Sequence, residues 1–590
     1  MKLALDSLRS AYESGTKPSD VVEDVYTRIE TEGMRPVWIS LVPRARALKR
    51  AQDLLTNDRR SLPLYGVPFA VKDNIDAAGM ETTAGCPAFA YRPNHSATVV
   101  RRLEEAGAIL IGKTNMDQFA TGLVGVRSPY GACSSVFSSE HISGGSSSGS
   151  AVVVAKGLVS FSLGTDTAGS GRVPAAFNNL VGLKPTRGAI STSGVIPACR
   201  SLDCISIFAA TCGDTKSIFE QARGFDAADS YSRCWKEAAG LWLGNAPRFG
   251  VPHESQLEFF GDEAARDLYF ESIGALEDLG GRRVEIDLTP FRAAADLLYA
   301  GPWVAERLAA IESFFAEHAE EIDPVVRGII SGGTKYSAVD CFNAQYRLSE
   351  LRRETSDILK TVDFLLLPTS PTTYKIAEVD ADPIRLNSNL GYYTNFVNLL
   401  DLAAVALPAG FRPNGLPFGV SLIGPKFSDT ALLYSADQLH GLLMNSVASL
   451  AAPSTPPGFT LITVVGAHLA GQPLNYQLTS RGACLLKTTR TAACYRLYAL
   501  DGSVPPKPGL IRDPGFHGGG IEVEVWAIPM TRFGSFVSLV VAPLGIGSLE
   551  LMDGTWVQGF ICEPYAAQNA REITQLGGWR AYLNSSSRTD

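Results

Sequence analysis

The amino-acid sequence predicts an α/β domain followed by a smaller, β-rich domain. Three observations support this prediction. Short apolar runs typical of strands alternate with amphipathic helical segments over residues 64–163. Residues 262–360 are mostly helical in pattern, and residues 364–368 and 403–411 return to short apolar strands. A proline-rich segment at 451–458 then precedes a series of short β-rich runs.

The length and composition indicate a soluble globular protein with more than one folding unit. At 590 residues, the chain exceeds the size at which a single hydrophobic core stops growing. The net charge of -8 argues against nucleic acid as a partner, because contact with a polyanion needs clustered lysine and arginine. The 10 cysteines contain no C-x-x-C pair, so neither a zinc site nor a dithiol motif is indicated.

The sequence carries no sign of export or of membrane insertion. Asp6 and Arg9 interrupt the apolar stretch that a signal peptide would need. The longest apolar run, at 151–163, is broken by Lys156 and Gly157 and is far shorter than a membrane span. We therefore expect a cytoplasmic protein with no membrane partner.

The elements of the first domain are predicted in chain order. Apolar positions recur at helical spacing over residues 19–55, so helices are expected before the first strand, which is placed at 64–71. The next elements are a helix over 98–106 that ends at Gly107, a strand over 108–111, a helix over 149–156 and a strand over 158–163. Such alternation is typical of an α/β sheet.

The domain boundaries are placed from the proline-rich segment. We expect a first domain over 1–450, a linker over 451–459 and a second domain over 460–590. The β-rich runs of the second domain are predicted at 460–465, 483–486, 522–528 and 535–542. Gly/Pro turns separate them, so this domain is expected to be small and dominated by strands.

One motif formally matches a nucleotide-binding loop. Gly107-Ala-Ile-Leu-Ile-Gly112-Lys113-Thr114 satisfies the pattern G-x-x-x-x-G-K-[ST]. A phosphate-binding loop follows its strand, whereas here the four residues between the glycines have strand character themselves. Amides paired in a strand cannot surround a phosphate, so we interpret this motif as structural.

A second motif formally matches the nucleophile elbow of α/β-hydrolases. Gly145-Ser-Ser-Ser-Gly149 would make Ser147 the nucleophile. An elbow must follow a buried strand, but residues 138–143 are polar except for Ile142. A flexible linker is also a poor interpretation, because an apolar helix begins near Ala151. The segment is expected to be an ordered part of the core domain.

Three separated segments together carry a more specific signal. They are Val71-Lys-Asp-Asn-Ile75, Gly144-Gly-Ser-Ser-Ser-Gly-Ser150 and Gly164-Thr-Asp-Thr-Ala-Gly-Ser-Gly-Arg172. In order and spacing they resemble the amidase signature family. The resemblance implies a mixed central sheet covered by helices, as well as a serine hydrolase site.

Site roles follow from this resemblance. It implies that Lys72 is the base, that Ser146 is the bridging serine, commonly with a cis peptide bond, and that Ser170 is the nucleophile. Ser148 stands where the family more usually has glycine, but this position is not one of the three reactive groups.

The chemistry agrees with a lysine base. A serine hydroxyl needs a neighbouring base, and His95 and His141 have no carboxylate partner at a suggestive spacing. An ordinary lysine, with a pKa of about 10.4, would be protonated at neutral pH. Burial beside hydroxyl groups would lower the pKa of Lys72. Asp73 need not contact the amine, because neighbouring residues of a strand point to opposite faces.

The same hypothesis passes the proton of the nucleophile through the bridging serine to the lysine and returns it to the departing amine. The developing oxyanion needs hydrogen-bond donors. Thr167, Ala168 and Gly169 form a tight turn of small residues before the nucleophile, and their backbone amides are predicted to be these donors.

The substrate is suggested by two further resemblances. Residues 164–179, with alanine at 168, and the two-domain layout are similar to the allophanate hydrolase branch of the family. In that branch a tyrosine and an arginine on the helical insertion bind the carboxylate of the substrate, and residues 299–307 resemble that segment. The resemblance implies that Tyr299 and Arg307 bind the carboxylate of allophanate. A guanidinium holds a carboxylate in a bidentate manner. The residues alone leave open that Arg307 is a solvated side chain on an exposed helix.

The second domain extends the resemblance over nearly the whole chain. Residues 464–475 and 543–548 look like the allophanate hydrolase C-terminal domain, which is similar in fold to γ-glutamyl cyclotransferases. His468 matches a histidine implicated there in decarboxylation of the intermediate left after the first ammonia departs. A structural histidine, and a domain that stabilises a dimer, remain alternatives.

The sequence therefore predicts an amidohydrolase that converts allophanate to ammonia and carbon dioxide without a metal or organic cofactor. A homodimer is expected. A biotin-dependent urea carboxylase or cyanuric-acid breakdown could supply the substrate, so functional coupling to urea carboxylase is one expectation. A general short-chain amidase of the same family and a catalytically silent scaffold of the same fold are the alternatives.

Overall fold

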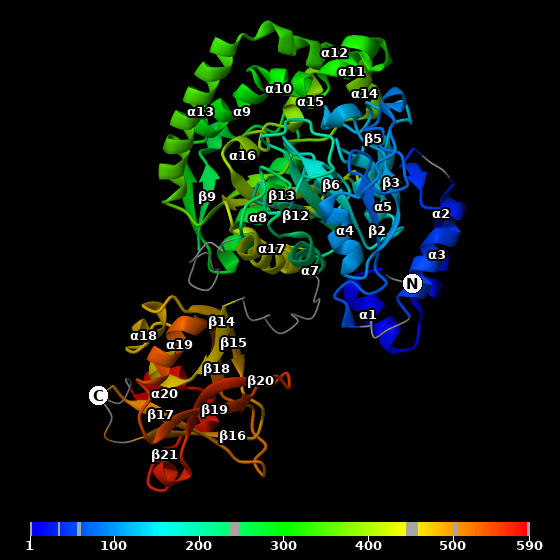
Figure 1. The fold of residues 1–590 in the computed structure, drawn as a ribbon. Helices are drawn as coiled ribbons and strands as arrows, with labels where there is room; N and C mark the ends of the chain where they lie inside the picture. Colours follow the sequence, from blue (N-terminus) through cyan, green and yellow to red (C-terminus); the bar gives the residue numbers. More distant parts are fainter. Residues whose placement is uncertain are drawn as a thin grey trace. The chain divides into compact units, whose positions relative to one another are not determined.

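The computed structural model describes residues 3–33, 36–55, 61–235, 247–443, 458–500, 502 and 505–586. These residues form two compact units, one within 3–235 and 248–443 and the other from Gly458 onward (Figure 1). Most of the predicted linker at 451–459 lies outside the described residues. The predicted domain boundaries therefore stay a prediction.

A mixed sheet is the centre of the first unit. Within the described ranges it has 11 strands, in the spatial order β1 (Trp38–Leu41), β3 (Ile109–Thr114), β2 (Pro68–Lys72), β6 (Phe161–Asp166), β8 (Cys204–Ala209), β7 (Val181–Lys184), β12 (Leu402–Phe411), β13 (Pro417–Pro425), β11 (Phe364–Pro368), β9 (Arg248–Pro252) and β10 (Arg282–Ile286). Strand β2 runs parallel to β3 and β6, whereas β8, β7, β12 and β13 pair antiparallel with their neighbours. The α/β fold with a mixed sheet is confirmed.

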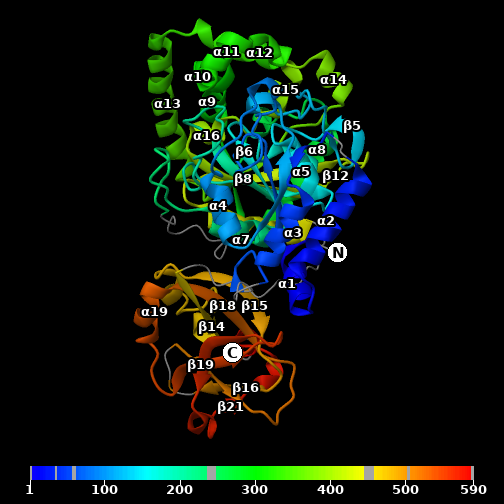
Figure 2. The same cartoon turned by 45° about the vertical axis from the view of Figure 1, so that its right-hand side comes forward.

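The helices of this unit pack on the sheet and on one another. They are α1 (Leu5–Glu13), α2 (Pro18–Glu32), α3 (Arg44–Asp53), α4 (Thr98–Glu105), α5 (Ser148–Ala155), α6 (Val173–Phe177), α7 (Cys212–Ala222), α8 (Glu263–Asp278), α9 (Thr289–Tyr299), α10 (Trp303–Ala310), α11 (Glu312–His318), α12 (Pro324–Ser331), α13 (Ala338–Leu359), α14 (Ile376–Ala381), α15 (Arg385–Leu390), α16 (Phe396–Leu399) and α17 (Asp429–Leu443). Figures 1 and 2 show α9 to α13, drawn in green, gathered at one end of the unit. Phe291 of α9, Leu351 of α13 and Phe396 of α16 pack into one core with Leu365 of β11.

The strand register brings the sequence motifs together. Strands β2 and β6 are parallel, with Val71 opposite Leu163, so both strands end at the same edge of the sheet. Lys72 is the last residue of β2 and Asp166 is the last residue of β6. Helix α5 packs against both strands, and the serine-rich loop that precedes it lies at the same edge.

The expectation that only helices precede the first strand is wrong. The segment Trp38–Leu41 forms β1, which pairs antiparallel with β3. Pro36 and Pro43 leave too few residues between them for a helix, and the side chain of Trp38 is buried. Four residues cannot show whether their apolar period is that of a strand or that of a helix.

The nucleotide-loop motif is structural, as predicted. Strand β3 includes Gly112 and Lys113, so these residues belong to the sheet and do not form a free loop. The side chain of Lys113 is fully buried, and its Nζ lies 3.4 Å from Oδ1 of Asp73. A lysine in a buried ion pair is not available to bind a phosphate.

The segment before the serine-rich loop differs from its prediction in one respect. Residues Ser138–Ile142 form a strand, β5, although the sequence suggested none. This strand pairs with β4 (Ser134–Ser135) in a separate two-stranded ribbon, and only Ile142 is buried along it. The buried strand that a nucleophile elbow requires does not precede Ser147.

The second unit, drawn in yellow to red in Figure 1, is rich in strands. Its sheets are β15-β18-β14-β20-β19 and β17-β16-β21, and their strands are β14 (Phe459–Val464), β15 (Cys484–Arg490), β16 (Tyr495–Leu500), β17 (Lys507–Arg512), β18 (Glu522–Pro529), β19 (Leu544–Glu550), β20 (Trp556–Cys562) and β21 (Arg571–Glu572). The helices are α18 (Tyr476–Thr479), α19 (Met530–Val537) and α20 (Trp579–Ser586). Trp526 and Trp579 are buried in the core of this unit.

The β-rich run predicted at 535–542 is wrong throughout, because its first residues are helical, residues 538–542 form turns and irregular backbone, and β19 begins at Leu544. Helix α19 spans Met530–Val537, and Phe536 on it is fully buried. Met530, Phe533 and Phe536 recur every third residue, which places them near one face of a helix.

In the part of the chain that the structure describes, no helix is long and apolar enough to cross a membrane.

Candidate active site

Lys72 lies at the buried end of β2. Its side chain is fully shielded from solvent, and the whole strand around it is buried. Its Nζ lies 2.8 Å from Oγ of Ser146 and 2.7 Å from Oγ1 of Thr165. The amine is therefore held between two hydroxyl groups at the edge where β2 and β6 end.

Ser146 connects the lysine to the predicted nucleophile. Its Oγ lies 2.9 Å from Oγ of Ser170, and the peptide bond between Gly145 and Ser146 is cis. Both serines are almost completely buried. The structure thus brings together all three residues predicted as reactive, in one continuous chain of hydrogen bonds from Ser170 through Ser146 to Lys72.

Burial changes the pKa of the Lys72 amine in the direction that favours proton transfer. It lowers the pKa of Lys72 to about 7, although the carboxylates of Asp117, Asp203 and Asp166 oppose this shift. A base with a pKa near the ambient pH combines a useful fraction of free amine with enough basicity to accept a proton. Lys72 therefore has the protonation behaviour that a catalytic base needs.

Asp73, the neighbour of Lys72, does not contact the amine. Its Oδ2 accepts hydrogen bonds from the backbone amide and the hydroxyl of Thr83, at 3.0 and 2.5 Å. Its Oδ1 faces Lys113 on β3. The expectation that the carboxylate of Asp73 need not contact the amine of Lys72 is confirmed.

A buried ion pair holds the loop that carries Ser170. The carboxylate of Asp166 accepts hydrogen bonds from Nε and Nη2 of Arg172, both at 2.9 Å, and both side chains are fully buried. The same carboxylate accepts the backbone amides of Gly169 at 3.0 Å and Gly171 at 2.9 Å. The amides on either side of Ser170 are thus fixed by one anion.

The predicted oxyanion donors are only partly free. The amide of Gly169 already donates to Asp166, so an oxyanion would have to compete with that carboxylate for it. The hydroxyl of Thr167 donates to Oδ1 of Asp203 at 2.5 Å, and Ala168 is buried in the same turn. The roles of Thr167, Ala168 and Gly169 stay a prediction.

Tyr299 and Arg307 are brought together, as the sequence predicts. Nη2 of Arg307, on α10, donates to the hydroxyl of Tyr299 at 3.3 Å, and Nη1 donates to Oγ1 of Thr121 at 3.1 Å. The arginine is only 2% exposed, which excludes the solvated surface side chain. Among the described residues it forms no ion pair, and its Nε has no hydrogen-bond partner.

Comparison with known proteins places this geometry in a family. The family model "Amidase" matches residues 20–433. The chain belongs to the amidase family. The model "Allophanate hydrolase C-terminal domain" matches residues 460–584, which lie in the second unit. Family membership and the serine-lysine geometry together identify an amidohydrolase.

Three known proteins show how similar this chain is to its relatives. It is 45% identical over 582 residues to the urea amidolyase of Saccharomyces cerevisiae, covering 94% of this chain and 32% of that protein. The solved selenomethionine-substituted allophanate hydrolase of Kluyveromyces lactis is 41% identical, with a TM-score of 0.79 and 99% of both chains covered. A glutamyl-tRNA(Gln) amidotransferase subunit of Symbiobacterium thermophilum is 36% identical over 408 residues, covering 63% of this chain and 82% of that protein. This chain spans about a third of the length of the urea amidolyases that it matches.

His468 of the second unit is largely buried. Its Nε2 lies 2.9 Å from Oε1 of Gln477, and its ring stacks on Phe560 at 4.9 Å between centroids. Burial lowers the pKa of His468, so the neutral ring is favoured at neutral pH. These contacts fit a structural histidine and a functional one equally.

Some contacts of the site are made by residues whose part in it the sequence did not predict. Thr165 and Asp166 lie inside a recognised motif, yet their bonds to Lys72 and to the loop amides were not predicted. Asp203 and Thr121 lie outside every motif and reach the site only through tertiary contacts. For these two residues, no pattern in the sequence pointed to the site.

Ser147, which the nucleophile-elbow pattern selects, makes a structural contact. The hydroxyl of Ser147 donates to the backbone carbonyl of Thr165 at 3.1 Å, so it supports the loop after β6. His141 contacts Ser138, with 2.9 Å between Nδ1 and Oγ, and does not reach the serine-lysine chain. Within the described ranges, no group of three or more His, Cys, Asp or Glu side chains is arranged to hold a metal ion.

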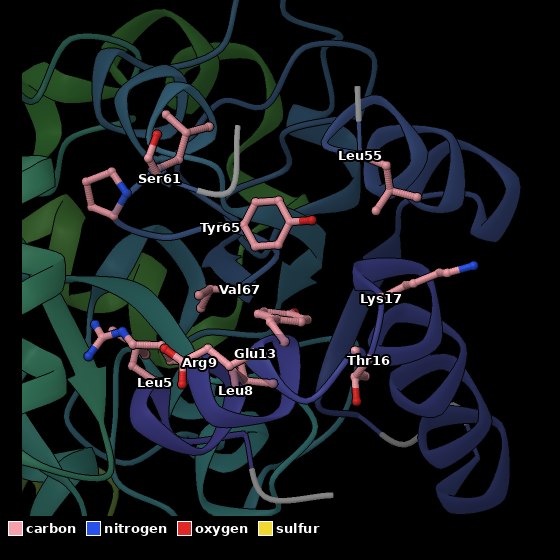
Figure 3. A pocket seen from close by; sticks show the side chains of 14 residues that line it. Leu5, Leu8, Arg9, Glu13, Thr16, Lys17, Leu55, Ser61, Tyr65 and Val67 are labelled. Atoms are coloured by element: carbon pink, nitrogen blue, oxygen red, sulfur yellow. The ribbon is translucent and has the colours of Figure 1, made fainter. Parts of the chain in front are cut away.

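A separate cavity lies at the N-terminal helices. Figure 3 shows this hollow of about 470 Å³, whose lining includes Leu5, Leu8, Tyr65 and Val67. None of the residues predicted for the amidase site lines it. It is therefore not the substrate site of the serine-lysine chain.

Proposed function

We propose that this chain is an allophanate hydrolase, with Ser170 as nucleophile, Ser146 as proton relay and Lys72 as base. The observation that carries the proposal is the continuous Ser170–Ser146–Lys72 chain together with a buried arginine that forms no ion pair with a carboxylate of the described residues. The match over 99% of both chains to a solved allophanate hydrolase supports this substrate.

The first half of the reaction uses the hydrogen-bonded chain as a proton path. Oγ of Ser170 attacks the amide carbonyl carbon, its proton passes to Ser146, and the proton of Ser146 passes to the free amine of Lys72. The C–N bond then breaks as the protons return along the same path to the departing nitrogen, and ammonia leaves. The acyl group remains as an ester on Ser170.

The second half repeats the path with water as the nucleophile. Water gives its proton to the same relay and attacks the ester carbonyl, and Ser170 leaves with a proton returned from Ser146. The released N-carboxycarbamate loses carbon dioxide and then decays to ammonia and further carbon dioxide. No step requires a metal or an organic cofactor.

The buried guanidinium supplies substrate selection. Allophanate carries a carboxylate beside its urea group, and Arg307 with Tyr299 would bind that anion through charge-assisted hydrogen bonds. A neutral amide would leave the buried guanidinium without a carboxylate hydrogen-bonded to it, which is costly. This preference for a substrate with a carboxylate over a neutral amide distinguishes an allophanate hydrolase from a general short-chain amidase.

Replacement of Arg307 by alanine is expected to lower kcat/KM for allophanate and malonamate by about 10²-fold, because charge-assisted hydrogen bonds to the carboxylate are lost. The rate with the neutral analogue malonamide should change much less. Ammonia release measured with all three amides checks this, and Arg307→Lys should keep part of the activity because it keeps the charge.

The same experiment can refute the assignment of allophanate as the substrate. Preference of the unmodified protein for malonamide, with no effect of Arg307→Ala, would identify a general short-chain amidase. Absence of turnover with every amide would favour the catalytically silent scaffold. Melting curves of each variant show whether the buried substitution has unfolded the protein.

For the second unit we propose that His468 promotes decarboxylation of the intermediate. His468→Asn is expected to leave the first ammonia release unchanged and to slow carbon dioxide release, because the imidazole can transfer a proton and the amide cannot. Gln477→Ala should have a weaker effect of the same kind, since Gln477 only orients the ring. If His468→Asn instead alters the sedimentation coefficient and not carbon dioxide release, the unit stabilises an assembly.

We also propose a place in the use of urea nitrogen, with a urea carboxylase supplying the substrate. The match to urea amidolyases supports this functional coupling. Supply from cyanuric-acid breakdown is the alternative source. The homodimer and the cytoplasmic location expected from the sequence stay predictions.

A further inference from the structure

A short segment, residues 198–203, lies between the nucleophile loop and the helix that carries Arg307. We call it the bridging segment. At one end, Oδ1 of Asp203 accepts the hydroxyl of Thr167 at 2.5 Å. The same carboxylate closes the segment on itself, because it accepts the amides of Ala198 at 2.8 Å and Cys199 at 3.2 Å. Asp203 therefore fixes Thr167, a residue of the loop that carries Ser170, to this segment.

The other side of the bridging segment is fastened to α10. Both carboxylate oxygens of Glu306 accept hydrogen bonds from Ser201, one from its amide and one from its hydroxyl, each at 2.7 Å. Arg187 donates to the carbonyl of Ser201 at 2.6 Å. Glu306 precedes Arg307 directly in the sequence, so the segment and the guanidinium share one turn of helix.

Asp203 is an unusual residue for a purely structural position. It is buried, and within the described ranges it forms no ion pair with a cation. Burial raises the pKa of Asp203 to about 6, and hydrogen bonds from Thr167 and from two backbone amides, together with the positive charge of Arg307, oppose this rise. A buried carboxylate of this kind is costly unless its hydrogen bonds are complete. It influences the pKa of Lys72 as well, so it lies close to the site electrostatically.

We propose that Asp203, Ser201 and Glu306 are positioning residues that couple the carboxylate-binding arginine to the acyl-transfer loop. This inference rests on the proposed function. One rigid segment sets the place of Arg307 and also that of Thr167, so it fixes the span between the substrate carboxylate and the carbonyl that Ser170 attacks. The preferred substrates are then amides with a carboxylate at the spacing of allophanate and malonamate. Succinamate, which is longer by one methylene group, should align poorly.

A double-mutant cycle with Glu306→Ala and Thr167→Val tests the coupling. Neither change removes a group of the proton relay or the guanidinium. Each is expected to lower kcat for allophanate by about tenfold, because a small misplacement in a preorganised site has effects of this size or larger. The double variant should be no slower than the slower single variant, since both changes break the same connection. The preference for malonamate over succinamate should fall in all three variants.

Controls separate this coupling from a general loss of stability. Glu312→Ala removes an exposed carboxylate at the start of α11 and should leave kcat unchanged. Glu306→Gln keeps one acceptor for Ser201 and should recover part of the rate. Melting temperatures of all variants are measured alongside, and Ser201→Ala replaces Glu306→Ala if the latter does not fold. Multiplying effects in the double variant, or a change in KM alone for Glu306→Ala, would overturn the proposal.

A second measurement does not depend on the substrate. Phenylmethanesulfonyl fluoride can react with an activated serine, and the mass of the intact protein reports sulfonylation of Ser170. We expect slower labelling in Glu306→Ala and in Thr167→Val than in the unmodified protein and in Glu312→Ala. If allophanate is not a substrate but labelling slows in this pattern, the proposed function fails and the coupling to the loop stands. Equal labelling rates in all four proteins would refute the coupling.

Discussion

Ser170→Ala is expected to abolish ammonia release from allophanate, with a loss of about 10⁴-fold or more in kcat. The hydroxyl of Ser170 is the terminal group of the hydrogen-bonded chain, 2.9 Å from Ser146, and alanine offers no atom that could form the acyl ester. Steady-state ammonia release, together with the absence of a mass increase after phenylmethanesulfonyl fluoride, checks this result.

Ser147→Ala is the matched control for this substitution. Ser147 is the residue that the formal nucleophile-elbow pattern selects, and among the described residues its hydroxyl forms hydrogen bonds with the backbone of Thr165 alone. We expect a loss of less than about tenfold, because the change disturbs a supporting contact and removes no reacting atom. Activity that survives Ser170→Ala and disappears in Ser147→Ala would reverse the assignment of the nucleophile.

Lys72→Met is expected to lower kcat by at least about 10³-fold, because it replaces the base by an apolar side chain of similar length. The free amine is the active form and burial lowers the pKa of Lys72 to about 7, so activity of the unmodified protein should rise with pH through about 7 and then level off. The residual activity of Lys72→Met should not show this rise. A pH profile that keeps the rise in the variant would assign it to another group.

The lowered pKa of Lys72 also predicts how the free energy of unfolding depends on pH. Since the pKa of Lys72 is lower in the folded protein, the unfolded chain binds more protons between pH 7 and about 10.4, and the free energy of unfolding should rise with pH across that window. Lys72→Met removes this dependence, so it should stabilise the protein more at pH 6 than at pH 10. Lys360→Met, at an exposed side chain on the surface, is the control for loss of a lysine.

The sequence by itself determined the fold class and pointed to the three residues that form the hydrogen-bonded chain. Lys72, Ser146 and Ser170 lie in motifs whose order and spacing are specific, and the parallel pairing of β2 with β6 then places two of these motifs at one sheet edge. The nucleotide-loop pattern could also be rejected from the sequence, because Ile109 to Ile111 have strand character. Local patterns suffice where the chemistry and the strand are encoded in neighbouring residues.

The sequence did not determine whether some short segments form a helix or a strand. β1 and α19 differ from their predictions because few apolar positions in a short stretch fit the period of a strand and of a helix alike. Pairing with β3 decides the first, and the burial of Phe536 decides the second. In both cases tertiary packing overrides a weak local preference.

Only the tertiary structure decided how the site is supported. The contact of Thr165 with Lys72, the bond of Thr167 to Asp203 and the burial of Arg307 all join segments far apart in the chain. Such contacts depend on which strands are neighbours and on where α10 packs, and no local period records either. The lowered pKa of Lys72 is likewise a property of the assembled core, because desolvation by the surrounding strands and helices produces it.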